Sequence, residues 1–180
     1  MRAAGRSRRA WGWHPLTDPW AARMVADAGI RPGQLVVDIG AGDGALTRHL
    51  VAAGASVLAV ELHPGRAEQL RTRFAAEDVT VVAVDVAAFR WPRRPFRVVA
   101  SPPFARSSEV LRGLLAPGSR LIAADLVLQR AVVRKYVDGR APGAGRWLRH
   151  WDVLPGRSLP RGAFRPPPQV DASVLVVRKR

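Results

Sequence analysis

Short apolar runs alternate with amphipathic segments along most of this chain. The runs are rich in Val, Leu, Ile and Ala, and their lengths are typical of strands buried on both faces of a sheet: 35–39, 56–60, 79–84, 96–100 and 121–128. Apolar residues recurring at helical spacing between them predict helices over 19–28, 45–53, 64–74, 107–115 and 129–137. Two further strands are predicted over 147–154 and 172–177. The pattern predicts an α/β fold, a seven-stranded mixed sheet with helices on both faces.

A glycine-rich turn follows the first predicted strand. Asp38 lies inside that strand, where an unpaired carboxylate would be costly, and Gly40, Gly42 and Gly44 follow at alternate positions. Glycine permits a positive φ and lets the backbone approach a ligand closely. A strand, a glycine turn and a helix form the first unit of doubly wound nucleotide-binding folds. An ordinary tight turn between a strand and a helix remains the alternative.

Acidic or polar residues stand at the ends of the next three strands. Glu61 lies about 20 residues past the glycines, where a carboxylate can accept hydrogen bonds from two ribose hydroxyls. Asp85 and Val86 follow the third strand and can meet an adenine amine. The segment Ser101 to Phe104, S-P-P-F, follows the fourth. Because ligands of open α/β sheets bind at the carboxyl ends of strands, we expect one shared pocket. Solvated strand ends and turn residues are the alternatives.

A large excess of basic residues points to the kind of partner. The chain has 29 Lys and Arg against 14 Asp and Glu, which gives a formal net charge of +15. This charge favours a polyanion, because neutralising phosphates releases counterions, although a merely basic protein remains possible. The sequence has no cysteine and no histidine spacing typical of a metal site, so we expect neither disulfide nor metal. No apolar run is long enough to span a membrane, and we expect a cytoplasmic protein.

The length of 180 residues predicts one domain behind a short basic arm. Residues 1–11 form the arm, and its candidate nucleic-acid contacts are Arg6, Arg8 and Arg9. Residues 12–180 form the domain. Asp18 is expected to cap the first helix because a proline follows it. A proline-rich stretch over 159–170, which carries Phe164, predicts a stiff loop.

Taken together, the motifs resemble those of a known family. D-I-G-A-G-D-G, E-L-H-P, D-V, S-P-P-F and F-R-P-P-P-Q-V-D occur in the order found in ribosomal RNA adenine N6-methyltransferases. The chain most resembles the Erm group, which methylates an adenine of 23S rRNA and confers resistance to macrolides, lincosamides and streptogramin B. The KsgA-type 16S rRNA dimethyltransferases are near relatives. The resemblance extends from about Gly12 to Val177 and implies the class I methyltransferase (Rossmann-like) fold.

The resemblance also implies a role for each matching residue. The cofactor would be S-adenosylmethionine, leaving as S-adenosylhomocysteine, and the implied cofactor-binding residues are His14, Asp38, Gly40, Gly42, Glu61, Asp85, Val86 and Ser101. The Ser101 hydroxyl and the Pro102 carbonyl would accept from the amino group of the target adenine. Phe104 would stack on that base, and Phe164 would pack on its other side. No general base is evident among these residues.

Three departures from the family pattern affect what we expect. Ser101 stands where the family usually has Asn, and Trp13 stands where it usually has Gln. The chain ends about where the catalytic domain of the family ends, so we expect a short form without the C-terminal helical domain. RNA affinity would then rest on the arm and on surface arginines. The expected partner is naked or precursor 23S rRNA, bound by a monomer.

Two other functions remain open at this point. Related motifs also present glutamine or other planar nitrogens, so a protein N-methyltransferase is one alternative. A non-catalytic RNA-binding protein with a methyltransferase fold is the other, and the intact glycine turn, Glu61 and Asp85 argue against it.

Overall fold

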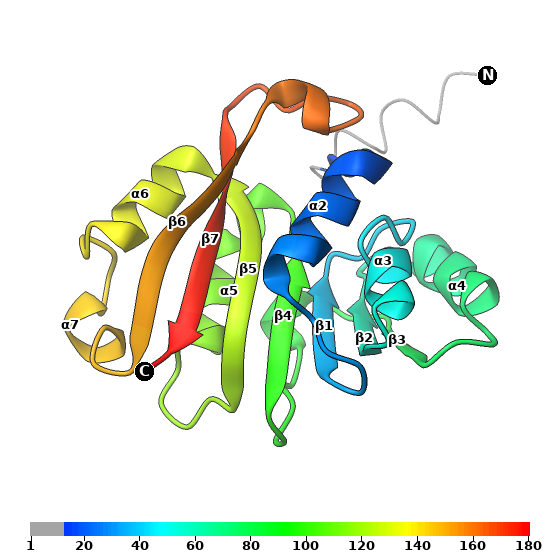
Figure 1. Ribbon diagram of the computed structural model, residues 1–180, viewed down its shortest axis with the longest axis horizontal. Helices are drawn as coiled ribbons and strands as arrows, with labels where there is room; N and C mark the ends of the chain where they lie inside the picture. The colour runs from blue at the N-terminus through cyan, green and yellow to red at the C-terminus, as the bar shows by residue number, and fades with distance from the viewer. Residues whose placement is uncertain (1–12) are drawn as a thin grey trace.

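Within residues 13–180, which this computed structural model describes, seven strands form one sheet in the order β3-β2-β1-β4-β5-β7-β6 (Figure 1). The strands are β1 (Leu35–Ile39), β2 (Ser56–Val60), β3 (Val79–Val82), β4 (Phe96–Ala100), β5 (Leu121–Gln129), β6 (Trp151–Leu159) and β7 (Ala172–Lys179). The first five run parallel, and β7 is antiparallel to both β5 and β6. The mixed seven-stranded sheet predicted from the sequence is confirmed.

Helices lie on both faces of this sheet. The α-helices are α2 (Asp18–Ala28), α3 (Thr47–Ala52), α4 (Pro64–Arg73), α5 (Ser107–Leu114), α6 (Arg130–Val137) and α7 (Ala144–Trp147). The 3-10 helices are η1 (Val86–Ala88), η2 (Phe104–Arg106) and η3 (Arg161–Ala163). Helix α2 lies in front of the sheet in Figure 1 and α5 lies behind it. Each face has its own core, because alternate residues of the buried strands point to opposite sides. No helix within residues 13–180 has the length and apolar character needed to cross a membrane.

The sixth strand begins later than predicted. Trp147 ends α7, where its ring stacks on that of Tyr136 with a centroid separation of 5.5 Å, and β6 begins only at Trp151. The strand then continues through Pro155 and Gly156 to Leu159, with a shift of register. The predicted range 147–154 was therefore wrong at both ends. Apolar residues around Trp147 fit a buried helix turn as well as a strand, and only packing decides between the two.

The first helix is also capped differently from the prediction. Thr17 is the N-cap residue of α2 and makes no capping hydrogen bond with its side chain. Asp18 is already helical, and its carboxylate is paired with Arg48 and with His49. The hydrogen bond from His49 is the main reason that the pKa of Asp18 is lowered.

The segment before α2 is tied to the proline-rich loop. Leu16 forms an isolated antiparallel bridge with Phe164. Around this bridge, the Thr17 N–H donates to the Ala163 carbonyl at 2.8 Å, and the Arg165 N–H donates to the Pro15 carbonyl at 3.0 Å. Trp13 and His14 immediately precede Pro15. These bonds therefore hold both residues close to the carboxyl ends of the strands.

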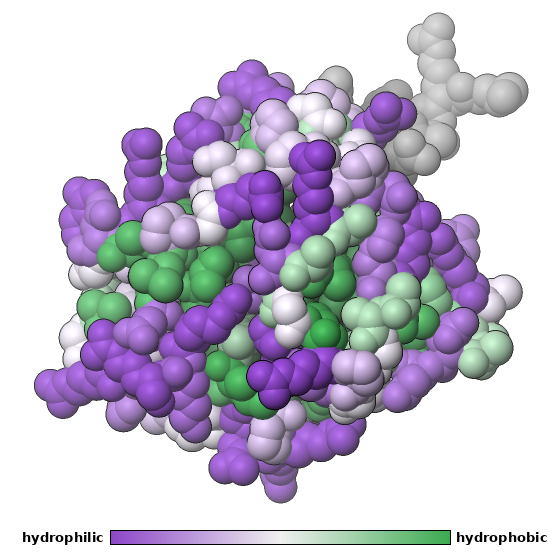
Figure 2. All heavy atoms as spheres, in the orientation of Figure 1, coloured by the Kyte–Doolittle hydropathy of each residue, from purple (hydrophilic) through white to green (hydrophobic). Residues whose placement is uncertain are grey.

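The front face of β5, β7 and β6 carries no helix among residues 13–180 (Figure 1). Figure 2, in the same orientation, shows apolar residues gathered over these strands. Leu154 of β6 is the most exposed of them, with 52% of its surface accessible. The back face of the same strands is covered by α5, α6 and α7.

Candidate active site

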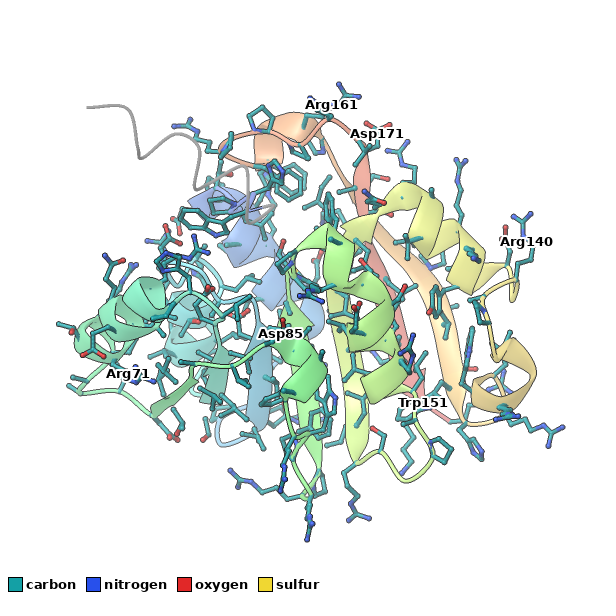
Figure 3. All side chains as sticks on the ribbon, turned by 180° about the vertical axis from the view of Figure 1, so that it is seen from behind. Arg71, Asp85, Arg140, Trp151, Arg161 and Asp171 are labelled. Atoms are coloured by element: carbon teal, nitrogen blue, oxygen red, sulfur yellow. The ribbon has the colours of Figure 1, made fainter. Side chains whose placement is uncertain are left out.

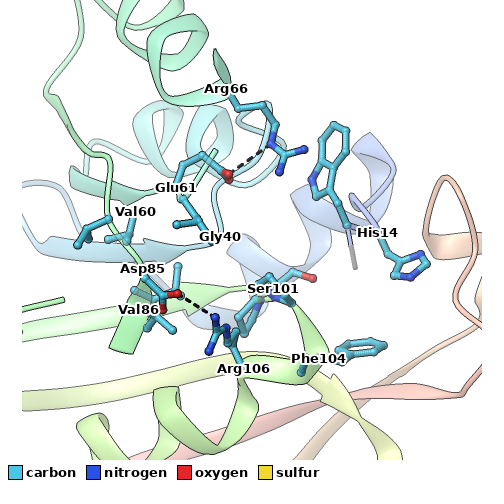
Figure 4. Close-up of a pocket in the computed structure, with 17 residues that line it drawn as sticks. His14, Gly40, Val60, Glu61, Arg66, Asp85, Val86, Ser101, Phe104 and Arg106 are labelled. Carbon is cyan, nitrogen blue, oxygen red and sulfur yellow. Dashed lines mark hydrogen bonds and ion pairs between the residues drawn. The ribbon is translucent and has the colours of Figure 1, made fainter. Parts of the chain in front are cut away.

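One cavity of about 610 Å³ opens at the carboxyl ends of β1, β2, β3 and β4 (Figure 4). Each strand sends the residues after it into the wall: Gly40 after β1, Glu61 after β2, Asp85 beyond β3, and Ser101 to Phe104 after β4. The shared pocket expected at this edge is therefore present in the structure. Its volume lies in the range of small-molecule and cofactor sites.

The glycine turn is packed too closely for side chains. A Cβ added to Gly40 would lie 2.9 Å from Cδ of Pro103, and one added to Gly42 would lie 2.6 Å from Nε1 of Trp13. Both glycines also have positive φ, 73° and 61°. The turn is fixed to the neighbouring strand, since the N–H groups of Gly40 and Ala41 both donate to the Val60 carbonyl. Gly40 and Trp13 both line the cavity. Gly42 does not line it, because the Trp13 ring packs against this glycine.

Glu61 connects the glycine turn to α4. Its Oε2 accepts from the Gly42 N–H at 2.8 Å, and its Oε1 accepts from the His63 N–H at 2.8 Å and from Nε of Arg66 at 3.3 Å. The side chain is nearly buried, with 4% of the residue exposed, yet it lines the cavity. A carboxylate has about four acceptor positions, so a position remains on Oε2 for a hydroxyl group.

Asp38 lies beneath the turn rather than on the cavity wall. It is 1% exposed, and its Oδ2 accepts from the hydroxyl of Thr47 at 2.8 Å. Burial, with a smaller contribution from the charge of Glu61, raises the pKa of Asp38 to about 7. Asp38 is absent from the residues that line the cavity. The structure therefore does not support direct cofactor contact by Asp38, and its position is one of support for the turn.

Asp85 is held at the opposite end of the cavity by Arg106. Oδ1 of Asp85 accepts from the Ala87 N–H at 2.9 Å, and Oδ2 accepts from Nη2 of Arg106 at 2.8 Å (Figure 4). Arg106 also reaches Glu109 at 3.3 Å. Val86 lines the cavity beside Asp85, as expected from the sequence. Arg106 therefore links the loop after β3 to the loop after β4.

His14, not Phe164, faces Phe104. The rings of His14 and Phe104 are 6.4 Å apart between centroids, with planes inclined by 27°, and both line the cavity with Ser101 and Pro102 (Figure 4). The expectation for Phe164 is not met, because its ring is 1% exposed and packs in the front core against Leu16. An aromatic residue in a proline-rich loop can face a ligand or the interior, and the bridge to the N-terminal segment turns this one inward.

The sequence did not identify two arginines of the site. Arg66, in the first turn of α4, and Arg106, two residues after Phe104, both line the cavity. Trp13, noted only as a departure from the family pattern, packs on the glycine turn. The spacing of five residues between Glu61 and Arg66 was the available signal, but many surface arginines have similar spacings. The predicted RNA contacts Arg6, Arg8 and Arg9 lie outside the described residues.

The lining fits a nucleoside-bearing cofactor. Two carboxylates stand apart along the wall, at Glu61 and Asp85, and the closely packed turn at Gly40 lets backbone approach a ligand without a side chain between them. Within residues 13–180 there is no group of three or more metal-ligating acidic or histidine side chains.

Comparison with known proteins places these features among rRNA methyltransferases. A family model described as ribosomal RNA adenine dimethylase matches residues 5–180. An rRNA methyltransferase of Streptomyces thermotolerans is 34% identical over 188 residues, covering 98% of this chain and 60% of the relative. The mycinamicin-resistance protein MyrB of Micromonospora griseorubida is 39% identical over 163 residues, covering 88% of this chain and 50% of the relative.

A third curated relative and a solved structure agree with this. An rRNA adenine N-6-methyltransferase of Corynebacterium diphtheriae is 31% identical over 182 residues, covering 99% of this chain and 71% of the relative. The crystal structure of the 23S rRNA methyltransferase ErmE superposes with a TM-score of 0.83 at 26% identity, covering 92% of this chain and 69% of that one. The chain thus spans between half and about seven tenths of the length of these proteins.

Proposed function

Because this chain belongs to the ribosomal RNA adenine dimethylase family, we propose that it methylates N6 of an adenine in 23S rRNA with S-adenosylmethionine. The observation that carries the proposal is the single cavity that brings Glu61 and Asp85 together with Ser101 to Phe104. We further propose that the substrate is naked or precursor rRNA in the cytoplasm, that a monomer acts on it, and that methylation confers resistance to macrolides, lincosamides and streptogramin B.

The loop after β4 would activate the target amino group. An aromatic amine is a weak nucleophile because its lone pair is delocalised into the ring. When bound, S-adenosylmethionine supplies a methyl group activated by a sulfonium. The Ser101 hydroxyl and the Pro102 carbonyl can accept from the amine, and this favours its rehybridisation as positive charge develops on nitrogen. Alignment of the two reacting groups can contribute about 7–11 kcal/mol.

Phe104 would hold the target base in this position. An adenine must leave its stack to enter the pocket, which costs a few kcal/mol and least in a loop or bulge. Stacking on an aromatic ring returns about 1–3 kcal/mol per base. The ring of Phe104 is partly exposed at the cavity and faces His14, so it is available for such a contact.

A basic groove on the back of the molecule offers a site for the RNA backbone. It has a volume of about 810 Å³ and lies between α5, the front helix in Figure 3, and α6 with α7. Its exposed basic residues are Arg112, Arg120, Lys135, Arg146 and Lys179. Among residues 13–180, no Asp or Glu lines the groove. Ser108 lies in the wall of the groove, four residues after Phe104, so the groove starts near the loop that follows β4. Basic side chains gathered in this way without a neighbouring carboxylate of the described part of the chain are suited to phosphates.

Charge reversal in the groove should weaken RNA binding. For Arg112→Glu combined with Lys135→Glu, we expect about tenfold lower affinity for a 23S rRNA fragment and a salt slope reduced by about two, because two phosphate contacts are lost. Filter binding between 50 and 200 mM salt, roughly the range over which such contacts are sensitive, measures both quantities.

The matched control reverses two exposed arginines elsewhere, Arg31 and Arg71. It changes the net charge by the same amount and lies outside the groove. Equal losses in the two double variants would show that overall charge, and not this groove, holds the RNA.

Ser101→Ala should slow turnover while leaving cofactor affinity nearly unchanged. The variant removes one of two proposed acceptors, and a hydrogen bond of this kind contributes about 1 kcal/mol, so we expect kcat to fall about fivefold. Binding of S-adenosylhomocysteine should change less than about twofold by calorimetry. Ser158→Ala, at an exposed position of β6, is the control. An equal loss of affinity and turnover would contradict the assigned role.

The proposed function itself is tested with labelled S-adenosylmethionine. Protein is incubated with protein-free 23S rRNA, and N6-methyladenine is mapped by mass spectrometry of the digested RNA. Label in rRNA, together with macrolide resistance in cells that express the protein and not in cells without it, is the expected result. Label in protein and none in RNA would favour the protein methyltransferase instead.

A further inference from the structure

We propose that Arg66 binds the carboxylate at the amino-acid end of the cofactor, and that the ring of Trp13 holds the Arg66 guanidinium in place. This inference rests on the proposed function, because it assumes S-adenosylmethionine in the cavity. It assigns a role to two residues of the wall, Arg66 and Trp13, that the sequence motifs and the strand ends do not explain.

Arg66 is held by two contacts at the cavity wall. Its Nε donates to Oε1 of Glu61 at 3.3 Å, and its Cζ lies 4.5 Å from the centroid of the Trp13 ring. Figure 4 shows the guanidinium beside the carboxylate of Glu61. Only 15% of the side chain is exposed. Such a guanidinium has lost most of the rotational freedom that a surface arginine would give up on binding a ligand.

The terminal nitrogens of Arg66 remain available as donors. The guanidinium makes a hydrogen bond through Nε to Glu61 and a cation–π contact with the Trp13 ring, and no residue of 13–180 accepts a hydrogen bond from Nη1 or Nη2. The four N–H bonds on these two nitrogens are therefore available to a ligand in the cavity that Arg66 lines. A planar guanidinium with open donors matches a carboxylate, which it can bind through two parallel hydrogen bonds.

The other cation of the cavity is already engaged. Arg106 donates to Asp85 at 2.8 Å and to Glu109 at 3.3 Å, and it lies at the end of the cavity assigned to adenine. Nδ1 of His14 donates a hydrogen bond to the Pro166 carbonyl at 2.8 Å. Among residues 13–180, Arg66 is thus the arginine of this cavity that has no carboxylate on its terminal nitrogens.

The order of the wall places the amino-acid end at Arg66. With adenine at Asp85 and the ribose at Glu61, the methyl group must point toward the loop from Ser101 to Phe104. Arg66 also lines the cavity, and it lies on the far side of Glu61 from Asp85 (Figure 4). Trp13, which packs on Gly42, lines the cavity beside it. Glu61 would then join the two subsites, since it accepts from Arg66 on one oxygen and is open to the ribose on the other.

The test compares two ligands that differ only in the carboxylate. S-adenosylhomocysteine and its decarboxylated analogue, which keeps the amino group, are titrated by calorimetry into the wild type, Arg66→Gln and Arg66→Lys. We expect Arg66→Gln to bind S-adenosylhomocysteine about 30-fold more weakly and the decarboxylated analogue within about threefold of wild type, because charge-assisted hydrogen bonds are lost only to the carboxylate. Arg66→Lys, which keeps the charge without the planar fork, should lie between.

Arg71→Gln, on the exposed side of the same helix, is the matched control, and thermal unfolding of each variant checks the fold. Equal losses for both ligands in Arg66→Gln would mean that Arg66 acts only through Glu61, and would overturn the assignment. If Arg66→Gln does not fold, equal affinities of the wild type for the two ligands would also overturn the assignment, because the carboxylate would then contribute nothing to binding. A wild type that binds neither ligand would count against the proposed function instead, so the two failures can be told apart.

Discussion

Glu61→Gln is expected to bind S-adenosylhomocysteine about 100-fold more weakly than the wild type, because truncating a buried, hydrogen-bonded charge pair costs about 2–5 kcal/mol. Glu61 accepts from the Gly42 N–H, the His63 N–H and Arg66 Nε, and one acceptor position remains for the ligand. Glutamine has one oxygen, so its amide nitrogen would have to face an N–H donor at one of these contacts. The glycine turn or Arg66 would therefore have to move.

Calorimetry with S-adenosylhomocysteine measures this loss directly. Glu68→Gln is the control, since Glu68 lies on α4 in an exposed pair with Arg71 and not in the cavity. Unchanged affinity in Glu61→Gln would show that the second oxygen of Glu61 is not used by the cofactor, and the ribose would have to be held elsewhere.

Asp38→Asn is expected to be more stable than the wild type above about pH 7, and the advantage should disappear toward pH 4. Burial raises the pKa of Asp38 from its usual 3.8 to about 7. Since each unit of pKa shift corresponds to 1.36 kcal/mol, the charged carboxylate destabilises the folded protein by about 4 kcal/mol. Asparagine is neutral at every pH, and its oxygen can still accept from the Thr47 hydroxyl.

The sign follows from proton binding. Between pH 3.8 and about 7 the folded protein keeps the proton on Asp38 while the unfolded chain has released it. The wild type therefore loses stability as the pH rises through this window, and the difference between the two proteins becomes constant above it. Urea unfolding at several pH values measures the difference.

Asp78→Asn, at an exposed position, controls for the loss of one acidic residue. The free energies of unfolding of the wild type and Asp38→Asn could instead differ by a constant amount from pH 4 to pH 8. That result would show that Asp38 is not protonated in the folded protein. The same data bear on the turn, because Asp38 supports it from beneath and lies near the charge of Glu61.

Much of the fold followed from short-range pattern. The strands 35–39, 56–60 and 96–100 were predicted with the bounds that the structure has. They are buried parallel strands, for which an uninterrupted apolar run between turn residues is a strong signal. Near the C-terminus the predicted strand 147–154 was wrong at both ends: Trp147 belongs to α7, and β6 continues past Leu154 through a proline, a glycine and a shift of register.

The candidate site divided in the same way. Glu61, Asp85 and Ser101 were predicted at strand ends, and they line one cavity because parallel strands deliver their carboxyl ends to one edge. The predictions for Asp38 and Phe164 depended on which way a side chain points. The structure turns both away from the cavity, Asp38 toward Thr47 and Phe164 into the front core.

By itself the sequence determined the order of strands and helices, the glycine turn and the acids that follow the strands, because these depend on residue type and on spacing along the chain. Only the tertiary structure decided three contacts of the site: the Trp13 ring packs on Gly42, Arg66 donates to Glu61, and Arg106 donates to Asp85 at the other end of the cavity. These contacts join segments that meet only when the sheet is assembled. No local pattern encodes them, since an arginine on a helix looks the same in sequence whether it faces solvent or a buried carboxylate.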